Sequence, residues 1–244
     1  MADAIFEHAR LVEIYDPLDA DRSDLTVYAD LVDELGAEAI LDVGCGTGTF
    51  ACLLAARGKD VIGVDPAAAS IDVARRKPDA HLVRWLVGDA TSLPPLQVDL
   101  AVMTGNVAQV FVDEPAWRET LRSVHAALRP GGTFVFEVRD PGQEAWREWN
   151  RDASFREVDI PEVGVVQTWV DLTDVAPPLV SFRWTFVFAS DGYRATSDST
   201  LRFRSRAELD AALAESGFAV REVRDAPDRP GREWVYVAVS TPTA

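Results

Sequence analysis

Residues 41–50 read Leu-Asp-Val-Gly-Cys-Gly-Thr-Gly-Thr-Phe, and this stretch decides the fold. Residues 40–43 are typical of the end of a buried strand, and a helix is predicted directly after the glycines. Gly44, Gly46 and Gly48 permit a tight turn without side chains, so backbone N–H groups and a helix N-terminus can approach a ligand closely. The spacing is GxGxG, whereas the dinucleotide fingerprint is GxGxxG, and no lysine stands in the P-loop position.

An acidic residue follows where a ribose-binding carboxylate is expected. Residues 60–65 read Asp-Val-Ile-Gly-Val-Asp, a second predicted strand that ends on Asp65. In dinucleotide-binding units, a carboxylate about 20 residues beyond the glycine turn binds the ribose hydroxyls. Together with the glycine spacing, Asp65 favours a nucleoside ligand without a diphosphate over NAD. A P-loop nucleotide triphosphatase is disfavoured as well.

Taken in order, five segments resemble the class I S-adenosylmethionine (AdoMet)-dependent methyltransferases. They are residues 42–48 for the first motif, Asp65 for the ribose-binding acid, Gly88-Asp89-Ala90 for the adenine motif, residues 99–104 (Asp-Leu-Ala-Val-Met-Thr) for the fourth strand, and residues 128–134 (Leu-Arg-Pro-Gly-Gly-Thr-Phe) for the turn before the fifth. The motifs are specific together over residues 41–139, and the resemblance is looser elsewhere. It implies an α/β fold, a Rossmann-like seven-stranded sheet with helices on both faces. It also implies AdoMet as cofactor and S-adenosylhomocysteine as product.

The resemblance further implies which residues meet the cofactor, from the glycine turn, the ribose acid, the adenine motif, the end of the fourth strand and an N-terminal lid. These cofactor-binding candidates are Tyr15, Arg22, Gly44, Cys45, Gly46, Asp65, Pro66, Asp89, Ala90 and Thr104. Asp42 is expected to brace the glycine turn through hydrogen bonds. For Asp89 the alternative is a structural role, because aspartate also caps turns.

Polar residues after the fourth and fifth predicted strands are the substrate-facing candidates, because ligands bind beyond the carboxyl ends of strands in open α/β sheets. They are Asn106, Glu137 and Arg139. Glu137 and Arg139 share one face of their strand, so a salt bridge between them is the alternative. Enzymes that methylate exocyclic amines of nucleic-acid bases usually carry an Asn- or Asp-Pro-Pro-aromatic motif here, whereas residues 104–107 read Thr-Gly-Asn-Val. No catalytic residue is nominated, because the sulfonium of AdoMet is already an activated leaving group.

Strands and helices alternate through the middle of the chain, which predicts right-handed βαβ units. Strands are expected at 39–43, 60–64, 82–87, 98–103 and 132–138, with helices near 48–57, 67–76 and 114–128. Three antiparallel strands follow at 163–170, 179–189 and 193–203, with Asp191-Gly192 as a hairpin turn. A Ser205–Glu208 capping box begins another helix, and the last two strands are expected at 218–224 and 233–239. We expect one methyltransferase domain over 1–244, with a helical lid (1–36), a cofactor-binding core (37–152), an antiparallel insertion (153–203) and a C-terminal part (204–244).

The insertion resembles in layout that of the amino-sugar N-methyltransferases. It either encloses a small acceptor, with Trp169 and Trp184 nearby, or forms a homodimer interface, and the sequence leaves both open. Trp146 and Trp149 are three residues apart on a predicted helix and would share a face, as core or as pocket wall. His125, beside the apolar face of its helix, is predicted to be structural.

Composition excludes several classes of partner. The formal net charge of −16, without a basic stripe, argues against nucleic acid, whose binding is largely phosphate neutralisation. No stretch approaches the ~20 apolar residues of a membrane span. The two cysteines do not indicate a disulfide framework, which suits the cytoplasm, and with three scattered histidines no metal is expected.

The sequence therefore predicts a cytoplasmic AdoMet-dependent methyltransferase that acts on a nitrogen or oxygen nucleophile of a small molecule. One alternative is a catalytically silent AdoMet-binding protein, which would keep residues 41–90 but lack an acceptor pocket. The other is an NAD-linked oxidoreductase, which the GxGxG spacing disfavours.

Overall fold

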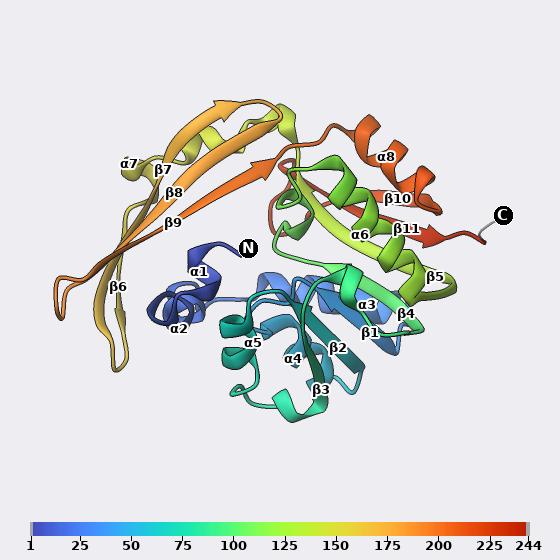
Figure 1. Cartoon of the computed structure of the whole chain (residues 1–244), viewed down its shortest axis with the longest axis horizontal. Helices are drawn as coiled ribbons and strands as arrows, with labels where there is room; N and C mark the ends of the chain where they lie inside the picture. Colours follow the sequence, from blue (N-terminus) through green and yellow to red (C-terminus); the bar gives the residue numbers. More distant parts are fainter. Residues whose placement is uncertain (1, 243–244) are drawn as a thin grey trace.

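A seven-stranded sheet forms the centre of the molecule in the computed structural model, which describes residues 2–242 (Figure 1). Its strands are β1 (Ala39–Val43), β2 (Asp60–Asp65), β3 (Val83–Val87), β4 (Val98–Met103), β5 (Leu128–Arg139), β10 (Phe218–Asp225) and β11 (Glu233–Ser240), in the order β10-β11-β5-β4-β1-β2-β3. Strands β1 to β5 pair in parallel, and β11 pairs antiparallel with both β5 and β10. The predicted Rossmann-like sheet with an antiparallel last strand is confirmed, and β10 and β3 are its edge strands.

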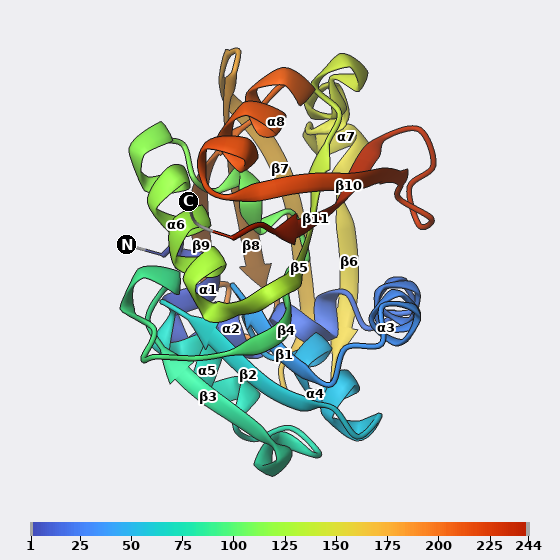
Figure 2. The same ribbon diagram turned by 90° about the vertical axis from the view of Figure 1, so that its right-hand side faces the viewer.

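Helices cover both faces of this sheet, because each has an apolar side that is buried against it. They are α3 (Asp24–Glu34), α4 (Thr49–Ala56), α5 (Ala68–Ala74), α6 (Glu114–Ala127) and α8 (Arg206–Glu215). Buried residues of α6 and α8, Trp117 and Leu213 among them, form one core with β4 and β5. Tyr28 of α3 and Phe50 of α4 belong to a second core, and Figure 2 shows α3 and α6 on opposite sides of the sheet.

Most element boundaries follow the local signals in the sequence. Asp113 stands at the N-cap of α6, although its side chain makes no capping hydrogen bond, and Ser205 with Glu208 forms the predicted capping box of α8. Strand β5 begins at Leu128 rather than at residue 132, because Leu128 pairs with Val98 before an irregularity in the ladder. The signals for a helix end and for the start of a strand overlap there.

A second, antiparallel sheet follows β5 in the sequence. It contains β6 (Arg156–Ile160), β7 (Gly164–Ala176), β8 (Leu179–Phe188) and β9 (Arg194–Arg202), in that order. Only three of these strands were predicted, because Arg156, Glu157 and Asp159 of β6 are exposed and interrupt any apolar pattern. Charged side chains are common on edge strands, where they oppose pairing with another chain. The hairpin between β8 and β9 turns at Asp191-Gly192, as predicted.

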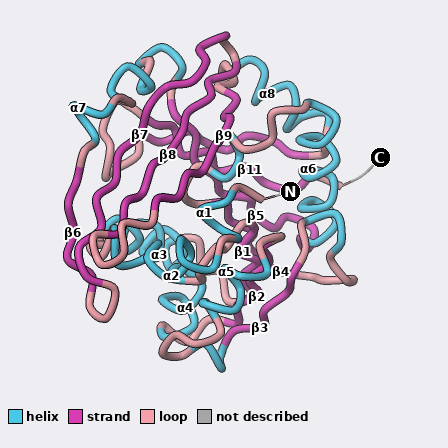
Figure 3. Tube along the Cα trace, turned by 60° about the vertical axis from the view of Figure 1, so that its left-hand side comes forward, coloured by secondary structure: helices cyan, strands magenta, loops and turns pink. Residues whose placement is uncertain are grey.

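The N-terminal helices connect the two sheets. They are α1 (Ala4–Glu7), α2 (Ala9–Leu18) and α3, so the helical prediction for this part is confirmed for these three helices, whereas residues 19–23, with Arg22 among them, form a loop. Helices α1 and α2 contact α5 on one side and strands β6 and β9 on the other. Figures 1 and 3 show them between the core and the four-stranded sheet. Leu11 and Ile14 are fully buried there, against Phe186 and its neighbours.

Several side chains with reactive chemistry are accounted for by the fold. Nε2 of His125 is hydrogen-bonded to the carbonyl of Thr241 at 2.9 Å, and its ring packs edge-on against Phe218, which confirms a structural role. Burial raises the pKa of both free thiols, Cys45 and Cys52, so neither is activated as a nucleophile. No group of three or more metal-binding side chains occurs among residues 2–242. Over the same residues, no helix is long and apolar enough to cross a membrane.

Candidate functional site

The glycine turn lies at the carboxyl end of β1. The N–H groups of Gly44 and Cys45 donate to the carbonyl of Val64, at 2.8 and 3.2 Å, which ties the turn to β2. A Cβ on Gly44 would lie 2.7 Å from the Val107 side chain, and one on Gly48 would lie 2.4 Å from Trp85. Gly46, with φ of +53°, faces open space instead. Two glycines therefore permit close packing, while the third leaves backbone accessible to a ligand.

Asp65 is bound to this turn. Its Oδ2 accepts the N–H of Gly46 and its Oδ1 accepts the N–H of Ala67, both at 2.8 Å. Burial raises the pKa of Asp65, and these two hydrogen bonds oppose the rise. Each carboxylate oxygen can accept a further hydrogen bond. The open backbone at Gly46 and the spare acceptor capacity beside it fit a nucleoside whose ribose binds Asp65.

Asp42 lies beneath the turn and does not behave as predicted. It is 1% exposed, and neither carboxylate oxygen has a hydrogen-bond partner among the described residues. The prediction that Asp42 braces the glycine turn through hydrogen bonds is therefore wrong. Burial, and secondarily the charge of Asp65, raises the pKa of Asp42 to about 7.

Asp42→Asn is expected to make stability less dependent on pH. Because the folded-state pKa is raised from 3.8 to about 7, wild-type Asp42 contributes stability below pH 3.8 that is lost as the pH rises through 7. Asparagine does not ionise, so the unfolding free energy of the variant, relative to that of wild type, should rise by about 2–4 kcal/mol as the pH increases from about 4 to 8. Urea unfolding at both pH values measures this, with the exposed Asp60→Asn as control. A difference that does not change with pH would contradict it.

The N-terminal candidates lie near the ribose acid. Tyr15 is half-buried, its ring 5.5 Å from that of Phe6, and burial raises its pKa. Arg22 lowers that pKa, while Asp65 is one of the nearby carboxylates that raise it. Arg22 itself forms a two-pronged ion pair with Asp24, at 3.1 and 3.2 Å. Tyr15 thus lies within the electrostatic range of both Arg22 and Asp65, and contact of Tyr15 and Arg22 with a cofactor stays a prediction.

The adenine candidates lie one loop further along. Asp89 is exposed and accepts the N–H of Thr91 at 2.9 Å, in a capping box completed by Ser92. The turn-capping alternative therefore describes what Asp89 does in the structure. Ala90 is buried behind it and Pro66 is exposed beside Asp65, so contact of these residues with an adenine stays a prediction.

The turn after β4 carries Thr104 and Asn106, and Glu137 of β5 holds it in place. Oε1 of Glu137 accepts the N–H groups of Gly105 and Asn106, at 2.6 and 3.1 Å, and Oε2 accepts the hydroxyl of Tyr28. Glu137 is 5% exposed and its carboxylate already accepts three donors of the protein, so its contact with a substrate stays a prediction. Burial and then the charge of Glu233 raise its pKa to about 7.

Arg139 is half-buried at the end of β5. Its Nη1 donates to Oε1 of Gln109 at 3.1 Å, and its Nε lies 3.6 Å from Glu233 rather than pairing with Glu137. The alternative of a Glu137–Arg139 salt bridge is therefore wrong. Glu233 also accepts from the side-chain amide of Asn106, at 3.3 Å, and pairs with Arg229 at 2.7 Å. Asn106 is 3% exposed and its Oδ1 has no partner among the described residues.

Two arginines at the C-terminal end of the insertion bind the loop between β4 and α6. The sequence did not indicate a role for either of them. Arg204 is 3% exposed and donates to the carbonyls of Ala108 and Phe111, at 3.2 and 2.6 Å, and to Glu114 at 2.8 Å. The neighbouring Arg202 donates to the carbonyl of Val112 at 3.1 Å. A sequence alone does not show that the guanidinium of an arginine donates hydrogen bonds to two backbone carbonyls.

The tryptophans of the insertion do not form one wall. Trp184 pairs with Val170 across the strands, so Trp169 lies on the opposite face, 4.5 Å beneath the guanidinium of Arg151. Trp184 packs, partly buried, against the core clusters beside both α2 and Trp149. Trp146 and Trp149 lie at a 3₁₀ helix (Ala145–Glu148) rather than on one α-helix face. They pack against Phe203, as the core alternative predicted.

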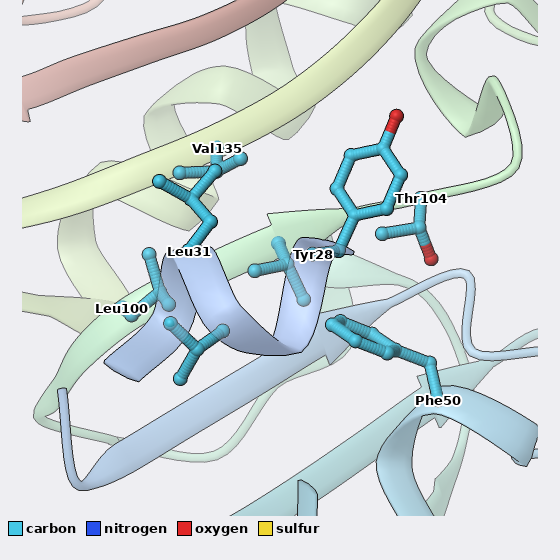
Figure 4. Close-up of a pocket in the computed structure, with 8 residues that line it drawn as sticks. Tyr28, Leu31, Phe50, Leu100, Thr104 and Val135 are labelled. Carbon is cyan, nitrogen blue, oxygen red and sulfur yellow. The ribbon is translucent and has the colours of Figure 1, made fainter. Parts of the chain in front are cut away.

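A small enclosed cavity adjoins Thr104 on the α3 side of the sheet. It is lined by Tyr28, Leu31, Val32, Phe50, Leu100, Val102, Thr104 and Val135, and Figure 4 shows Tyr28, Phe50 and Thr104 around it. Its volume of about 10 Å³ is no more than one water needs. The cavity is therefore a packing gap rather than a ligand site.

Comparison with known proteins agrees with this geometry. A methyltransferase domain model matches residues 40–132. The chain is 35% identical over 154 residues to the malonyl-[acyl-carrier protein] O-methyltransferase of Serratia marcescens, covering 62% of this chain and 55% of that protein. It is 33% identical over 175 residues to the demethylmenaquinone methyltransferase of Renibacterium salmoninarum, covering 64% and 72%. The chain spans about half of the length of the first curated relatives that it matches, or less.

The fold is shared with solved structures of similar size. CalS10, an amino pentose methyltransferase from Micromonospora echinaspora solved with S-adenosylmethionine bound, aligns with a TM-score of 0.69 and 22% identity. The alignment covers 93% of this chain and 97% of CalS10. Sequence and fold together place the chain in the family of AdoMet-dependent methyltransferases.

Proposed function

We propose that this protein transfers the methyl group of AdoMet to a nitrogen or oxygen nucleophile of a small molecule. The observation that carries the proposal is the open space at Gly46, directly beside the Asp65 carboxylate that accepts its N–H, at the carboxyl end of the parallel strands. Backbone and carboxylate suit the two halves of AdoMet, and the turn at Thr104 stands at the end of the neighbouring strand. The GxGxG spacing leaves no pyrophosphate turn for NAD.

AdoMet would supply a methyl group on a sulfonium, so no residue has to protonate a leaving group. What the chain must do is align the acceptor and exclude water. In the proposal, the backbone of residues 44–46 faces the methionine part, Asp65 binds the ribose, and Asp89 with Ala90 meets the adenine. Tyr15 and Arg22 close the lid over the cofactor. Thr104, Asn106 and Arg139 face the acceptor, while Glu137 supports the turn from below.

Support for a small acceptor comes from the way the insertion is attached. Arg10 of α2 pairs with Asp191 at the hairpin tip at 2.8 Å, and Arg204 binds the loop after β4 at the other end. The insertion is thus tied over the carboxyl ends of the strands at two points. Its outward face carries charged pairs such as Arg183–Asp198. These contacts favour a roof over the acceptor, and a homodimer formed through the insertion is the weaker proposal.

The acceptor atom is not fixed by the relatives. The two relatives by sequence are an O-methyltransferase and a demethylmenaquinone methyltransferase, and CalS10 is an amino pentose methyltransferase. We favour a partly apolar metabolite that is small enough to be covered by the insertion. The net charge of −16 weighs against nucleic acid as acceptor, and the cytoplasm is the proposed location.

The wild-type protein is expected to bind AdoMet and S-adenosylhomocysteine and not NAD. Titration calorimetry with the three ligands tests the cofactor, and tighter binding of NAD would contradict the proposal. A metabolite library, run beside tRNA, DNA and protein extracts, then tests the acceptor through release of S-adenosylhomocysteine. Activity confined to the macromolecular fractions would refute a small-molecule acceptor. Binding of AdoMet without turnover in any fraction would favour the catalytically silent alternative.

A further inference from the structure

One carboxylate of the N-terminal segment is bound directly to the glycine turn. Oδ1 of Asp16, on α2, accepts the hydroxyl of Thr47 at 2.7 Å and that of Thr49 at 3.2 Å. Its Oδ2 lies 2.7 Å from Nζ of Lys77, which follows α5. Three segments that are distant in the sequence therefore meet at one side chain, and one of them is the turn that faces the cofactor.

This contact differs from the other ion pairs of α2. Thr47 is 4% exposed, and the side chains of Lys77 and Asp16 are 18% and 28% exposed. Asp16 also faces Thr49, the first residue of α4, where the helix dipole favours a negative charge. By contrast, Glu13 and Arg76 form an ion pair with both side chains at least half exposed, and such pairs contribute little.

Asp16 and Tyr15 are neighbours on the same helical turn. Fixing the Asp16 carboxylate at the glycine turn therefore also fixes the place of Tyr15, whose hydroxyl lies within the electrostatic influence of Asp65. At its other end, α2 is held by Arg10, whose guanidinium lies 4.0 Å from the ring centre of Phe188. Among the ion-paired side chains of α2 (Arg10, Glu13 and Asp16), Asp16 is the one that is hydrogen-bonded to the glycine turn in the described part of the chain.

We infer that Asp16 is a positioning residue for the cofactor: by binding Thr47, Thr49 and Lys77 it holds α2, and Tyr15 with it, closed over the glycine turn. The inference rests on the proposed function, since it takes AdoMet as the ligand under α2. A ligand held by Tyr15 leaves only after α2 has moved, so loss of the Asp16 contacts speeds its release.

The test measures binding, for which no acceptor is needed. Asp16→Ala removes charge-assisted hydrogen bonds, so AdoMet and S-adenosylhomocysteine are expected to bind roughly 10- to 100-fold more weakly, chiefly through faster dissociation. Thr49→Val keeps the shape but removes the hydroxyl that donates to Asp16 and accepts from Lys77, while the Asp16 carboxylate keeps Thr47 and Lys77, so a smaller loss of roughly 2- to 10-fold is expected. Glu13→Gln, on the same helix, is the matched control and should stay within about twofold of wild type. Titration calorimetry gives Kd, and stopped-flow tryptophan fluorescence gives the dissociation rate.

The outcomes separate this inference from the function on which it rests. Wild-type affinity and dissociation rate in Asp16→Ala would overturn the inference and leave the proposed function standing. So would a variant that only unfolds at lower urea concentration, because a purely structural residue changes stability without changing ligand release. An equal loss in Glu13→Gln would also overturn it. If wild-type protein binds neither ligand, the proposed function itself fails.

Discussion

Replacing Asp65 by alanine should weaken AdoMet binding by roughly 100-fold or more. Two charge-assisted hydrogen bonds to the ribose, at about 1.5–3 kcal/mol each, correspond to at least that factor. The structure adds a second cause, because Asp65 also accepts the N–H groups of Gly46 and Ala67. The turn therefore loses its support together with the ligand contact, and titration calorimetry measures the sum.

Asp60→Asn is the matched control for this variant. Asp60 begins the same strand, β2, at its opposite end, where it is exposed. It should leave the affinity for AdoMet unchanged. Asp65→Asn keeps one acceptor oxygen and should fall between wild type and alanine. Wild-type affinity in Asp65→Ala would mean that the ribose is held elsewhere.

Glu137→Leu should cost about 3–5 kcal/mol of unfolding free energy, the largest expected effect on stability. Three donors, the N–H groups of Gly105 and Asn106 and the hydroxyl of Tyr28, lose their acceptor, and each unpaired buried group costs about 1–3 kcal/mol. Water reaches part of the turn, so the total cost is smaller than the sum of the costs of three unpaired donors. Urea unfolding at pH 7 measures the loss. We also expect methyl transfer to fall, because the turn carries Thr104 and Asn106.

Two further variants separate the hydrogen bonds of Glu137 from its charge. Tyr28→Phe removes one of the three donors and should cost about 1 kcal/mol. Glu137→Gln keeps the shape without a titratable proton. Because burial raises the pKa of Glu137 from 4.5 to about 7, its wild-type contribution is complete below pH 4.5 and is lost as the pH rises through 7. The unfolding free energy of Glu137→Gln should therefore rise relative to that of wild type between about pH 5 and 8. A difference that does not change with pH would contradict the account of Glu137 as a buried acid.

The fold could be predicted because its signals are local. The glycine turn, the Ser205 capping box and the Asp191-Gly192 hairpin each lie within a few residues, and apolar runs mark the parallel strands. Strand β6 was missed because an exposed edge strand carries no such run. The sequence also could not show that Trp169 and Trp184 lie on opposite faces of the sheet. That depends on which residues pair across β7 and β8, and a single sequence does not give this register.

The site was predictable only as far as its residues belong to those motifs. Asp65 lies where its motif placed it, bound to the turn that it was expected to serve. Other site residues have hydrogen-bond partners that are distant in the sequence: 109 residues away for Glu137, 31 for Asp16 and 96 for Arg204. A single sequence carries no signal for such pairings. Asp42 was misjudged because a motif fixes a residue's place but not its hydrogen-bond partners.

The bridge between the first helices and the last hairpin has a consequence for engineering acceptor choice. Ile5 donates its N–H to Ser197 at 3.0 Å, and Arg10 binds Asp191, so the first two helices and the insertion are packed against each other although about 180 residues separate them. A chimera that receives only a foreign β6–β9 sheet inherits a surface for which its own α1 and α2 have no matching side chains. Grafts that change the acceptor should therefore transplant both segments together, and the transplanted α2 should keep an aspartate at position 16, because its partners Thr47, Thr49 and Lys77 belong to the core that stays in place.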